Sequence, residues 1–512
     1  MKKFEITKLD KIILCIILVI YGILSFINLG STNNPQTFWH STDANQYALF
    51  EIKQGRSKTE KIRYFTGADI NDIYIFVSYD EENYSDPVIL KEDKVFAWKE
   101  SNFSGEFTYI RVYISNSNSY LGEFAIYDKS GNKLELEPLN ENAKLLLDEQ
   151  DTIPTDEITY MKTTYFDEIY FARTAYEHLN NMPVYEWTHP PLGKIIMSIP
   201  IAVFGMNPFA YRLLGNVAGI AMIAVIYIFA KMIFKETRYS VVAAILMAAD
   251  GMHFVQTRMG TVDSYLVLFI MLAFMFMYRY VTLEDKDKLK SKLIALFFSG
   301  LFMGLAIATK WSGVFAGIAL AIIFVIDFII KLVKRKKAKE KLWNKNWTII
   351  ILSCVGFFVV IPLAIYVLSY IPYYKLGYIK DIPSFIEYQQ KMYHYHADLV
   401  ATHPYSSPWY TWPIMKQSVF YWAGTYESGS LSRIVLLGNP AIWWFSLPAA
   451  LYFLVAGIWK RKVEYWFIFV AVVAMIMPYV GIPRIMFLYH YFPILPFVML
   501  IIVSFIKAIT GK

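Results

Sequence analysis

Ten long apolar runs constrain this chain more than any other feature. Most approach the roughly 20 residues that an α-helix needs to cross the hydrocarbon core of a bilayer. They cover 12–29, 209–234, 239–254, 262–281, 293–309, 311–330, 348–371, 441–458, 463–480 and 487–508. Of the 512 residues, 56% are hydrophobic and only 18% are charged, which is too apolar for a soluble protein of this size. The sequence predicts a polytopic α-helical membrane protein, whose first run is an uncleaved helix rather than a signal peptide.

A shorter apolar run, 195–206, decides the orientation of the predicted helices. Lys and Arg collect on the cytoplasmic side of membrane proteins. If this run does not cross, the basic amino terminus and four basic loops share that side; the loops are 231–238, 286–292, 331–345 and 460–462. We therefore predict a re-entrant or interfacial helix at 195–206, with both chain ends cytoplasmic and the cell membrane as the location. The net charge of +7 then reflects these loops and indicates no nucleic-acid partner.

Two long segments fall outside the membrane in this arrangement. In the first, residues alternate at 72–79, 107–114 and 122–128 with turn signals between them, which predicts a small extracytoplasmic β-sandwich for sugar binding or for spacing. The predicted order is a first transmembrane helix (1–30), the β-sandwich (31–155), an outer loop with an interfacial helix (156–208), transmembrane helices (209–371), an outer loop rich in aromatic residues and histidine (372–440), and carboxyl-terminal transmembrane helices (441–512).

An acidic pair, Asp167 and Glu168, follows the predicted β-sandwich within a helical pattern. Adjacent helical side chains point about 100° apart, so one carboxylate should face a site while the other serves a different partner. Shortly afterwards, the stiff turn that begins with His189-Pro-Pro would fix an imidazole beside the membrane. A solvated helix face and a purely structural histidine are the alternatives.

Four cations, Arg212, Arg258, Lys310 and Arg484, fall on the predicted outer face, against the usual bias. Any one of them could be an interfacial anchor. Together they indicate an anionic ligand such as a lipid phosphate, which guanidinium groups bind through two hydrogen bonds.

All eight histidines also fall outside in this arrangement. His394, His396 and His403 could suggest a metal site, but hydrogen bonding to a sugar or phosphate is a simpler role, so we predict no metal and no other cofactor. The two cysteines, Cys15 and Cys354, lie within apolar runs and imply no disulfide.

Several motifs in order resemble the protein O-mannosyltransferase family. They are Phe166-Asp-Glu168, Thr188-His-Pro-Pro-Leu-Gly-Lys194, Tyr211-Arg212, Gln256-Thr-Arg258 with Asp263, Thr309-Lys-Trp-Ser-Gly313, Met392-Tyr-His-Tyr-His396, the run from Thr402 to Pro413, Tyr421-Trp422, and Pro483-Arg484 through Phe492. The similarity extends over about 160–510. The predicted β-sandwich departs from the family, which usually has a short connection there.

The resemblance implies a GT-C membrane fold and inverting transfer of mannose from a polyprenyl phosphate to Ser or Thr hydroxyls of a protein. It implies Asp167 as the general base, Glu168 as its partner and Arg212 as a contact to the donor phosphate. We expect Arg258, Lys310, Arg484 and His490 to join Arg212 at the phosphate. The expected substrate-binding residues are His189, Asp263, Trp311, His394, His396, His403, Trp409 and Trp412. The expected partners are the lipid donor, an acceptor protein and membrane lipid, with a homo-oligomer as a further expectation.

Three other functions are also compatible with the sequence. An enzyme of the same fold could move another sugar, such as aminoarabinose, onto a lipid or wall polymer. A lipid or sugar transporter would usually have two related halves, and none is visible here. A binding protein with a membrane anchor would need only one helix.

Overall fold

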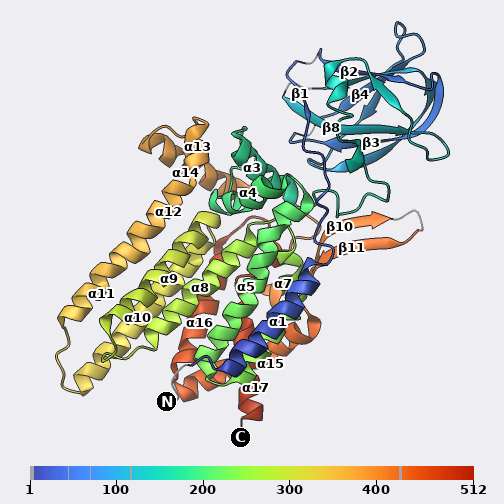
Figure 1. Cartoon of the computed structure of the whole chain (residues 1–512). Coiled ribbons are helices and arrows are strands. Elements are labelled where there is room, and N and C mark those ends of the chain that lie inside the picture. The colour runs from blue at the N-terminus through green and yellow to red at the C-terminus, as the bar shows by residue number, and fades with distance from the viewer. Residues whose placement is uncertain (1–4, 44, 70, 116–117, 426–428, 512) are drawn as a thin grey trace.

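The computed structural model describes residues 5–43, 45–69, 71–115, 118–425 and 429–511. A bundle of long helices carries a compact β-domain at one end, and both chain termini lie at the opposite end (Figure 1). We call the first end the β-domain end of the bundle.

Eight helices in the described residues are long and apolar enough to cross a membrane. They are α1 (Lys8–Phe26), α5 (Pro208–Phe234), α8 (Asp263–Val281), α9 (Leu289–Thr309), α10 (Gly313–Lys337), the continuous α11–η2–α12 (Lys345–Ser369), α15 (Pro440–Lys460) and α16 with η4 (Val463–Gly481). A ninth span arises if α6 (Thr237–Ala248) and α7 (Gly251–Thr257), which meet at 61°, count as one. The chain is therefore a multi-pass membrane protein, as predicted.

The count of spans is lower than the ten expected, for local reasons. The run 239–254 breaks because the Asp250 side chain accepts a hydrogen bond from the His253 amide at 3.1 Å and starts α7 in a new direction. The run 487–508 becomes the 3₁₀ turn η5 (Leu488–Tyr491) and the sixteen-residue α17 (Leu495–Thr510), because Pro493 cannot extend a helix from the residues before it.

The short apolar run near residue 200 forms α4 (Leu192–Phe204), a helix of 13 residues. At about 1.5 Å per residue it is too short to span a bilayer core of about 30 Å. This length agrees with the prediction that it does not cross.

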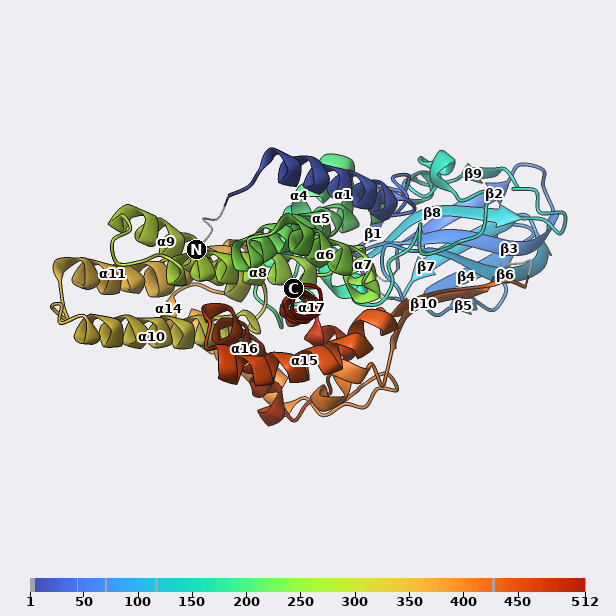
Figure 2. The ribbon, with the colours of Figure 1, turned by 90° about the horizontal axis from the view of Figure 1, so that it is seen from below.

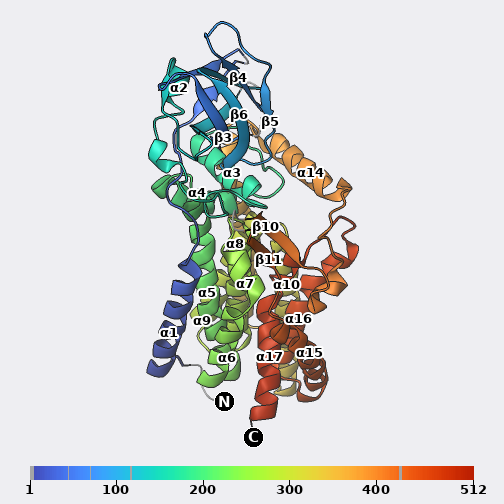
Figure 3. The same cartoon turned by 90° about the vertical axis from the view of Figure 1, so that its right-hand side faces the viewer.

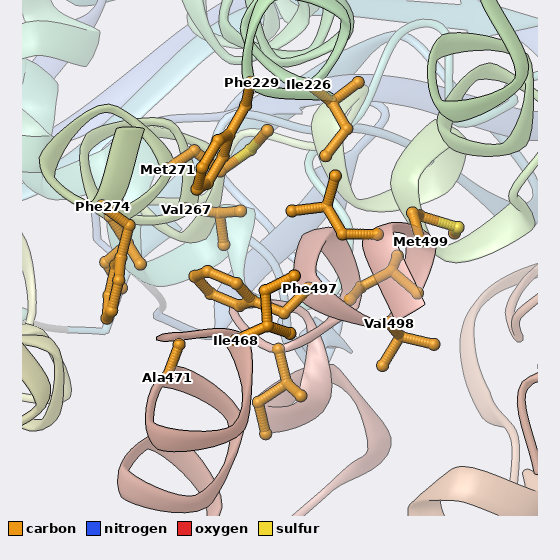
Figure 4. Packing of buried hydrophobic residues seen from close by; sticks show 14 of the residues in the cluster. Ile226, Phe229, Val267, Met271, Phe274, Ile468, Ala471, Phe497, Val498 and Met499 are labelled. Carbon is orange, nitrogen blue, oxygen red and sulfur yellow. The ribbon is translucent and has the colours of Figure 1, made fainter. Parts of the chain in front are cut away.

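Large apolar side chains hold the central helices together. Phe229 of α5, Phe274 of α8 and Phe497 of α17 are fully buried, and the rings of Phe274 and Phe497 lie 4.8 Å apart (Figure 4). Ile468 of α16 completes this contact region. Residues from four distant parts of the sequence thus form one core beneath the β-domain end.

The β-domain is a sandwich of two antiparallel sheets, as predicted. One sheet has the order β1 (Trp39–Ser41), β8 (Ser119–Tyr127), β3 (Ser57–Thr66), β6 (Trp98–Phe107). The other has the order β5 (Val88–Leu90), β4 (Ile73–Ser78), β7 (Tyr109–Ile114), β2 (Tyr47–Ile52), β9 (Leu136–Pro138). Inward side chains fill the space between them, including Phe50 and Phe124, whose rings stack at 5.3 Å.

The four-stranded sheet packs on α3 (Glu168–Asn180), the helix that begins at the acidic pair. Phe65 and Trp98 share a buried cluster with Phe171 of α3, and Phe96 contacts Tyr176 with ring centroids 4.9 Å apart. The five-stranded sheet is on the other side of the sandwich and faces away from the bundle (Figures 1 and 3). The inserted domain therefore supports the start of α3.

The second outer segment contains α13 (Ile371–Lys375), α14 (Ile382–Asp398), the 3₁₀ turn η3 (Trp409–Ile414) and a two-stranded hairpin of β10 (Val419–Thr425) and β11 (Leu431–Leu436). Figure 2 shows the hairpin extending from the bundle toward the β-domain side. With α3, these elements enclose the region that contains most of the predicted site residues.

Helix packing at Gly300 gives a test of this fold. A Cβ atom at Gly300 of α9 would lie 2.1 Å from the backbone oxygen of Phe357, whereas one at Gly356 would meet nothing within 4 Å. We expect Gly300→Ala to destabilise the protein by about 1–3 kcal/mol through overpacking, and Gly356→Ala to be neutral or stabilising. Thermal unfolding in detergent would measure both, and equal melting temperatures would contradict this helix contact.

Candidate active site

The backbone at the start of α3 sends the two acidic side chains in different directions. Phe166, just before the pair, has a φ of 48°, in the left-handed region that bulky residues rarely adopt. Its ring packs against Tyr421 at 4.3 Å and Tyr489 at 6.4 Å between centroids, which holds this conformation in place. Asp167 follows as the residue that caps α3, with no hydrogen bond from its side chain to the helix.

Glu168 is fully buried and every part of its carboxylate is occupied. Arg212 of α5 donates from Nε to Oε1 at 2.6 Å and from Nη2 to Oε2 at 2.8 Å. The backbone amides of Gly260 and Tyr165 donate to the same two oxygens at 2.9 and 3.1 Å. Glu168 therefore joins α3 to α5 and to the loop before α8.

Arg212 makes further hydrogen bonds besides those to Glu168. It donates to the backbone oxygens of Leu29, Tyr160 and Thr163 at 2.9 to 3.1 Å, and its side chain is 0% exposed. The structure thus corrects two predictions from sequence. Arg212 is fully buried with four of its five N–H groups bonded within the protein, and both Glu168 oxygens accept hydrogen bonds, so the two residues hold α3, α5 and the loop before α8 in position.

Asp167, unlike Glu168, has a carboxylate that no described residue occupies. Its carboxylate is half-buried and accepts no hydrogen bond from the residues that the structure describes. Burial and the nearby charge of Asp263 raise the pKa of Asp167 to about 7, against the lowering effect of Lys310. A carboxyl group with this pKa can exchange a proton near neutral pH, which suits a general base.

Asp263 and Lys310 form an ion pair close to Asp167. Lys310 donates to Asp263 Oδ1 at 2.8 Å, while Thr261 and Gln256 donate to Oδ2 at 3.1 and 3.4 Å. Gln256 accepts in turn from the Tyr421 hydroxyl at 2.6 Å. Asp263, predicted as a substrate contact, therefore fixes the Lys310 ammonium group, and the network ends on the β10–β11 hairpin.

His189 lies in a second buried network, which the sequence did not reveal in full. Lys194 of α4 donates to Glu186 at 2.5 Å, and Glu186 accepts from His189 Nδ1 at 2.9 Å. Although burial alone would raise it, the charges of Lys194 and His189 hold the pKa of Glu186 well below its usual range. Because the ionised Glu186 only accepts hydrogen bonds, Nδ1 of His189 carries the proton and Nε2 is left as an acceptor.

His396 and Arg484 meet beside His189. The two imidazole rings are 5.4 Å apart, His396 Nε2 donates to the Thr188 carbonyl at 2.7 Å, and Arg484 Nη1 donates to His396 Nδ1 at 2.6 Å. Burial, with the charges of His189 and Arg484, lowers the pKa of His396 to about 4. His396 is therefore neutral, and it orients a guanidinium that has no carboxylate partner among the described residues.

Aromatic rings form the walls of this region. The His490 ring stacks at 5.9 Å on Trp412 and at 4.7 Å on Tyr489, and its Nδ1 contacts the Phe487 backbone. Burial and the charges of Lys310 and Arg484 lower the pKa of His490 to about 3. Trp311 packs 5.9 Å from His396, which places it in the same region.

Several predicted residues lie elsewhere or have other contacts. The His394 side chain is 69% exposed and pairs with Asp398, on a different face of α14 from His396, so it does not join the cluster around His396, and its role in substrate binding stays a prediction. Arg258 donates to the Ile27 and Asn28 carbonyls at the end of α1 and stacks over Phe254. The other predicted substrate-binding residues contact their neighbours: Trp412 Nε1 donates to Ser407, His403 packs on Phe487, and Trp409 packs on Tyr410.

Metal-ligand geometry is found far from this region. Within the described ranges, Glu123, Asp148 and Glu149 are the one group of three or more candidate ligands close enough to share an ion, and they belong to the β-domain. Their oxygens already accept hydrogen bonds, including those from Glu149 N to Glu123 at 2.7 Å and from Gln36 N to Glu149 at 2.7 Å.

Comparison with known proteins adds to this geometry. The family model described as dolichyl-phosphate-mannose-protein mannosyltransferase matches residues 152–376. A second, the C-terminal four TMM region of protein-O-mannosyltransferase, matches 382–512. The chain belongs to the protein O-mannosyltransferase family. Both matches begin after most of the β-domain, so the domain lies outside what these family models describe.

Curated relatives agree. A polyprenol-phosphate-mannose–protein mannosyltransferase of Mycobacterium tuberculosis is 26% identical in a match that covers 58% of this chain and 66% of that protein, just under two thirds of its length. One of Mycolicibacterium smegmatis is 26% identical in a match that covers 68% of this chain and 78% of that protein.

A solved structure shows the same GT-C fold. The protein O-mannosyltransferase Pmt1–Pmt2 complex of Saccharomyces cerevisiae, bound to the sugar donor, matches with a TM-score of 0.59 at 12% identity. The match covers 68% of this chain and 82% of that one.

The different surroundings of the two acidic residues predict different effects of substitution. Glu168→Gln and Arg212→Met should each destabilise the protein by about 3–5 kcal/mol, because either leaves an uncompensated buried charge or breaks a saturated network. Asp167→Asn should leave the melting temperature near that of the wild type or raise it, since the carboxylate loses no hydrogen bond. Thermal unfolding of the three variants checks this, and a loss of stability confined to Asp167→Asn would contradict these roles.

Proposed function

We propose that this protein transfers mannose from a polyprenyl-phosphate donor to Ser or Thr hydroxyls of proteins, with inversion at the sugar carbon. One observation carries the proposal: the Asp167 carboxylate, which has no hydrogen-bond partner among the described residues, lies near the Lys310 ammonium group and beside a group of fixed donors, in a chain of this family. The names of the curated relatives support mannose, the lipid donor and the protein acceptor.

The chemistry needs a base at the acceptor and cations at the donor. A hydroxyl oxygen attacks the sugar carbon while its proton passes to Asp167, and the bond from that carbon to the phosphate oxygen breaks. The reacting sugar resembles an oxocarbenium ion. The leaving polyprenyl phosphate is a stable anion, so it needs charge stabilisation rather than an acid.

Lys310 and Arg484 are the best candidates for the phosphate. Lys310 influences the pKa values of Asp167, His189 and His490, which indicates that its ammonium group is within electrostatic reach of all three. Arg484 is bonded to a neutral imidazole and keeps other N–H groups for a ligand. We assign His189 Nε2, Trp311 and the ring edge of His490 that does not contact Phe487 to sugar binding. We assign Arg212 and Arg258 to holding the helices in position.

The proposed topology follows the basic loops. The connections after α5, α8, α10 and α15 are at the end of the bundle opposite the β-domain, where both termini lie. The positive-inside rule then makes this end cytoplasmic and the β-domain end extracytoplasmic, in the cell membrane. Acceptor proteins would meet the site after export.

Loss of the base is the first test. We expect purified wild-type protein to add a hexose to a Ser/Thr-rich peptide from polyprenyl-phosphate-mannose, detected by mass spectrometry. Asp167→Asn should lower kcat by about 100- to 10,000-fold, the usual contribution of a general base.

The matched control is Asp156→Asn, because the Asp156 side chain is 72% exposed in the same connecting segment and should leave the rate unchanged. Wild-type turnover by Asp167→Asn would overturn the assignment. Transfer of a different sugar, or transfer to a lipid acceptor, would favour another enzyme of the same fold.

The raised pKa of Asp167 predicts the pH dependence. The base must be ionised, so kcat/KM should rise between about pH 5.5 and about pH 8 with a midpoint near 7. The effect on stability has the opposite sign. A carboxyl whose pKa is higher in the folded state binds its proton more tightly there, so the free energy of unfolding falls as the pH rises from about 4, the usual pKa of the group, to about 7, and then levels off.

Rate measurements across this range, with thermal unfolding of wild type and Asp167→Asn at each pH, test both statements. The variant should gain stability relative to the wild type only at the higher pH values. A flat rate profile with parallel melting curves would show that Asp167 does not titrate near neutrality.

A further inference from the structure

The outward face of the five-stranded sheet has an unusual composition. Strand alternation places Ile75 and Val112 in the core, where both are 0% exposed. The opposite face of the same two strands, β4 and β7, carries Tyr74 and Phe76 beside Tyr113, with Tyr74 and Tyr113 directly paired across the strands. A solvent-facing sheet surface would ordinarily be polar, so this aromatic surface calls for an explanation.

A cavity of about 430 Å³ lies on this face, within the range of roughly 300–1,000 Å³ that is typical of small-molecule sites. Its lining combines rings, hydroxyl groups and one cation: Tyr74, Phe76, Tyr84, Ser85, Arg111, Tyr113, Ile114 and Ser115. The rings are locked by mutual contacts, since Tyr113 lies 5.5 Å from Phe76 and 5.4 Å from Tyr47. The surface is therefore preformed.

Arg111 is the charged group of this cavity. Its guanidinium lies over the rings of Tyr84 and Tyr47, 3.9 and 4.7 Å from their centroids. No carboxylate forms an ion pair with it among the residues that the structure describes, whereas Arg56 and Arg63 of the same domain pair with Glu106 and Glu100 at 2.8 and 2.5 Å. Its Nε is buried without a hydrogen-bond partner in that part of the chain. A fixed, unneutralised guanidinium favours an anionic ligand.

The position in the sheet favours a sugar over a peptide. Extended peptides usually add to the edge of a sheet, where backbone groups are unpaired. Here β4 and β7 are inner strands whose backbone groups already pair with their neighbours, so side chains alone can hold the ligand. Flat rings offer packing to the apolar face of a pyranose, and the guanidinium binds oxygens at its edge.

We propose that this cavity binds a carbohydrate with an acidic substituent, a carboxylate or a phosphate. It is on the side of the sandwich away from α3, so it is separate from the region around Asp167 and has no part in the transfer step. Its role is to bring the enzyme and the surface that bears its acceptors together, by binding an anionic glycan on that surface.

Titration of the full chain in lipid nanodiscs tests the proposal. The anionic probes are trigalacturonate and mannose 6-phosphate, which separate the two substituents, and mannotriose is the neutral probe. We expect at least one anionic probe to bind, mannotriose to bind more weakly, and the binding to weaken with salt. Arg111→Met should weaken binding of the anionic probe about tenfold or more, as expected for loss of a charge-assisted contact.

Arg56→Met is the matched control, because Arg56 is an exposed arginine of the same domain that already has a carboxylate partner. It should leave binding unchanged. Tyr84→Leu, which removes a ring over the guanidinium, is a second variant and should weaken the same probe. Peptide glycosylation by all three variants should equal that of the wild type.

Three outcomes would overturn the proposal. They are no binding of either anionic probe, binding that Arg111→Met and Tyr84→Leu leave unchanged, and binding of an unglycosylated acceptor peptide in place of the sugars. The last outcome would make the cavity a peptide site.

Discussion

The buried ion pair between Glu168 and Arg212 is the interaction on which the site depends. It joins the start of α3 to α5, and the Gly260 amide adds the loop before α8. Because both partners are 0% exposed and are hydrogen-bonded to several elements, the backbone at Asp167 has little freedom to move. Two adjacent carboxylates thus differ: Glu168 fixes the fold, while Asp167, which accepts no hydrogen bond from the described residues, is the base in our proposal.

The β-domain packs on α3 and therefore also helps to hold the start of this helix in position. Its four-stranded sheet buries Phe65 and Trp98 against α3, and Asp69 pairs with Arg173 on the same helix at 3.0 Å. Ordering an inserted domain costs conformational entropy, but the shared core stabilises the helix that presents Asp167. Our proposed glycan site uses the other sheet, so one domain can support the catalytic helix and still bind a ligand independently.

Sequence patterns predicted the parts that depend on periodicity. Long apolar runs predicted the bundle, and alternation predicted β4, β7 and β8, because burial acts on every second residue of a strand. The adjacent carboxylates diverge, as helix geometry predicts, but the sequence does not show which of the two is held by an ion pair. That choice depends on Arg212, 44 residues away, and on the left-handed Phe166. The link from Lys194 through Glu186 to His189 was missed although the three residues lie within nine positions of one another, because it depends on how the turn between them brings Lys194 back to Glu186.

The charges near Asp167 would couple two events of the proposed transfer, the departure of the phosphate and the release of the hydroxyl proton. Lys310 is held in place by Asp263, His396 and His490 are kept neutral by burial, and Arg484 has no carboxylate partner among the described residues. An anionic phosphate bound there would raise the pKa of Asp167 further. As the bond to the sugar breaks, charge grows on the phosphate while the hydroxyl proton is released. In the proposed transfer, Asp167 would therefore become a stronger base as the sugar bond breaks, because the growing negative charge on the phosphate raises its pKa.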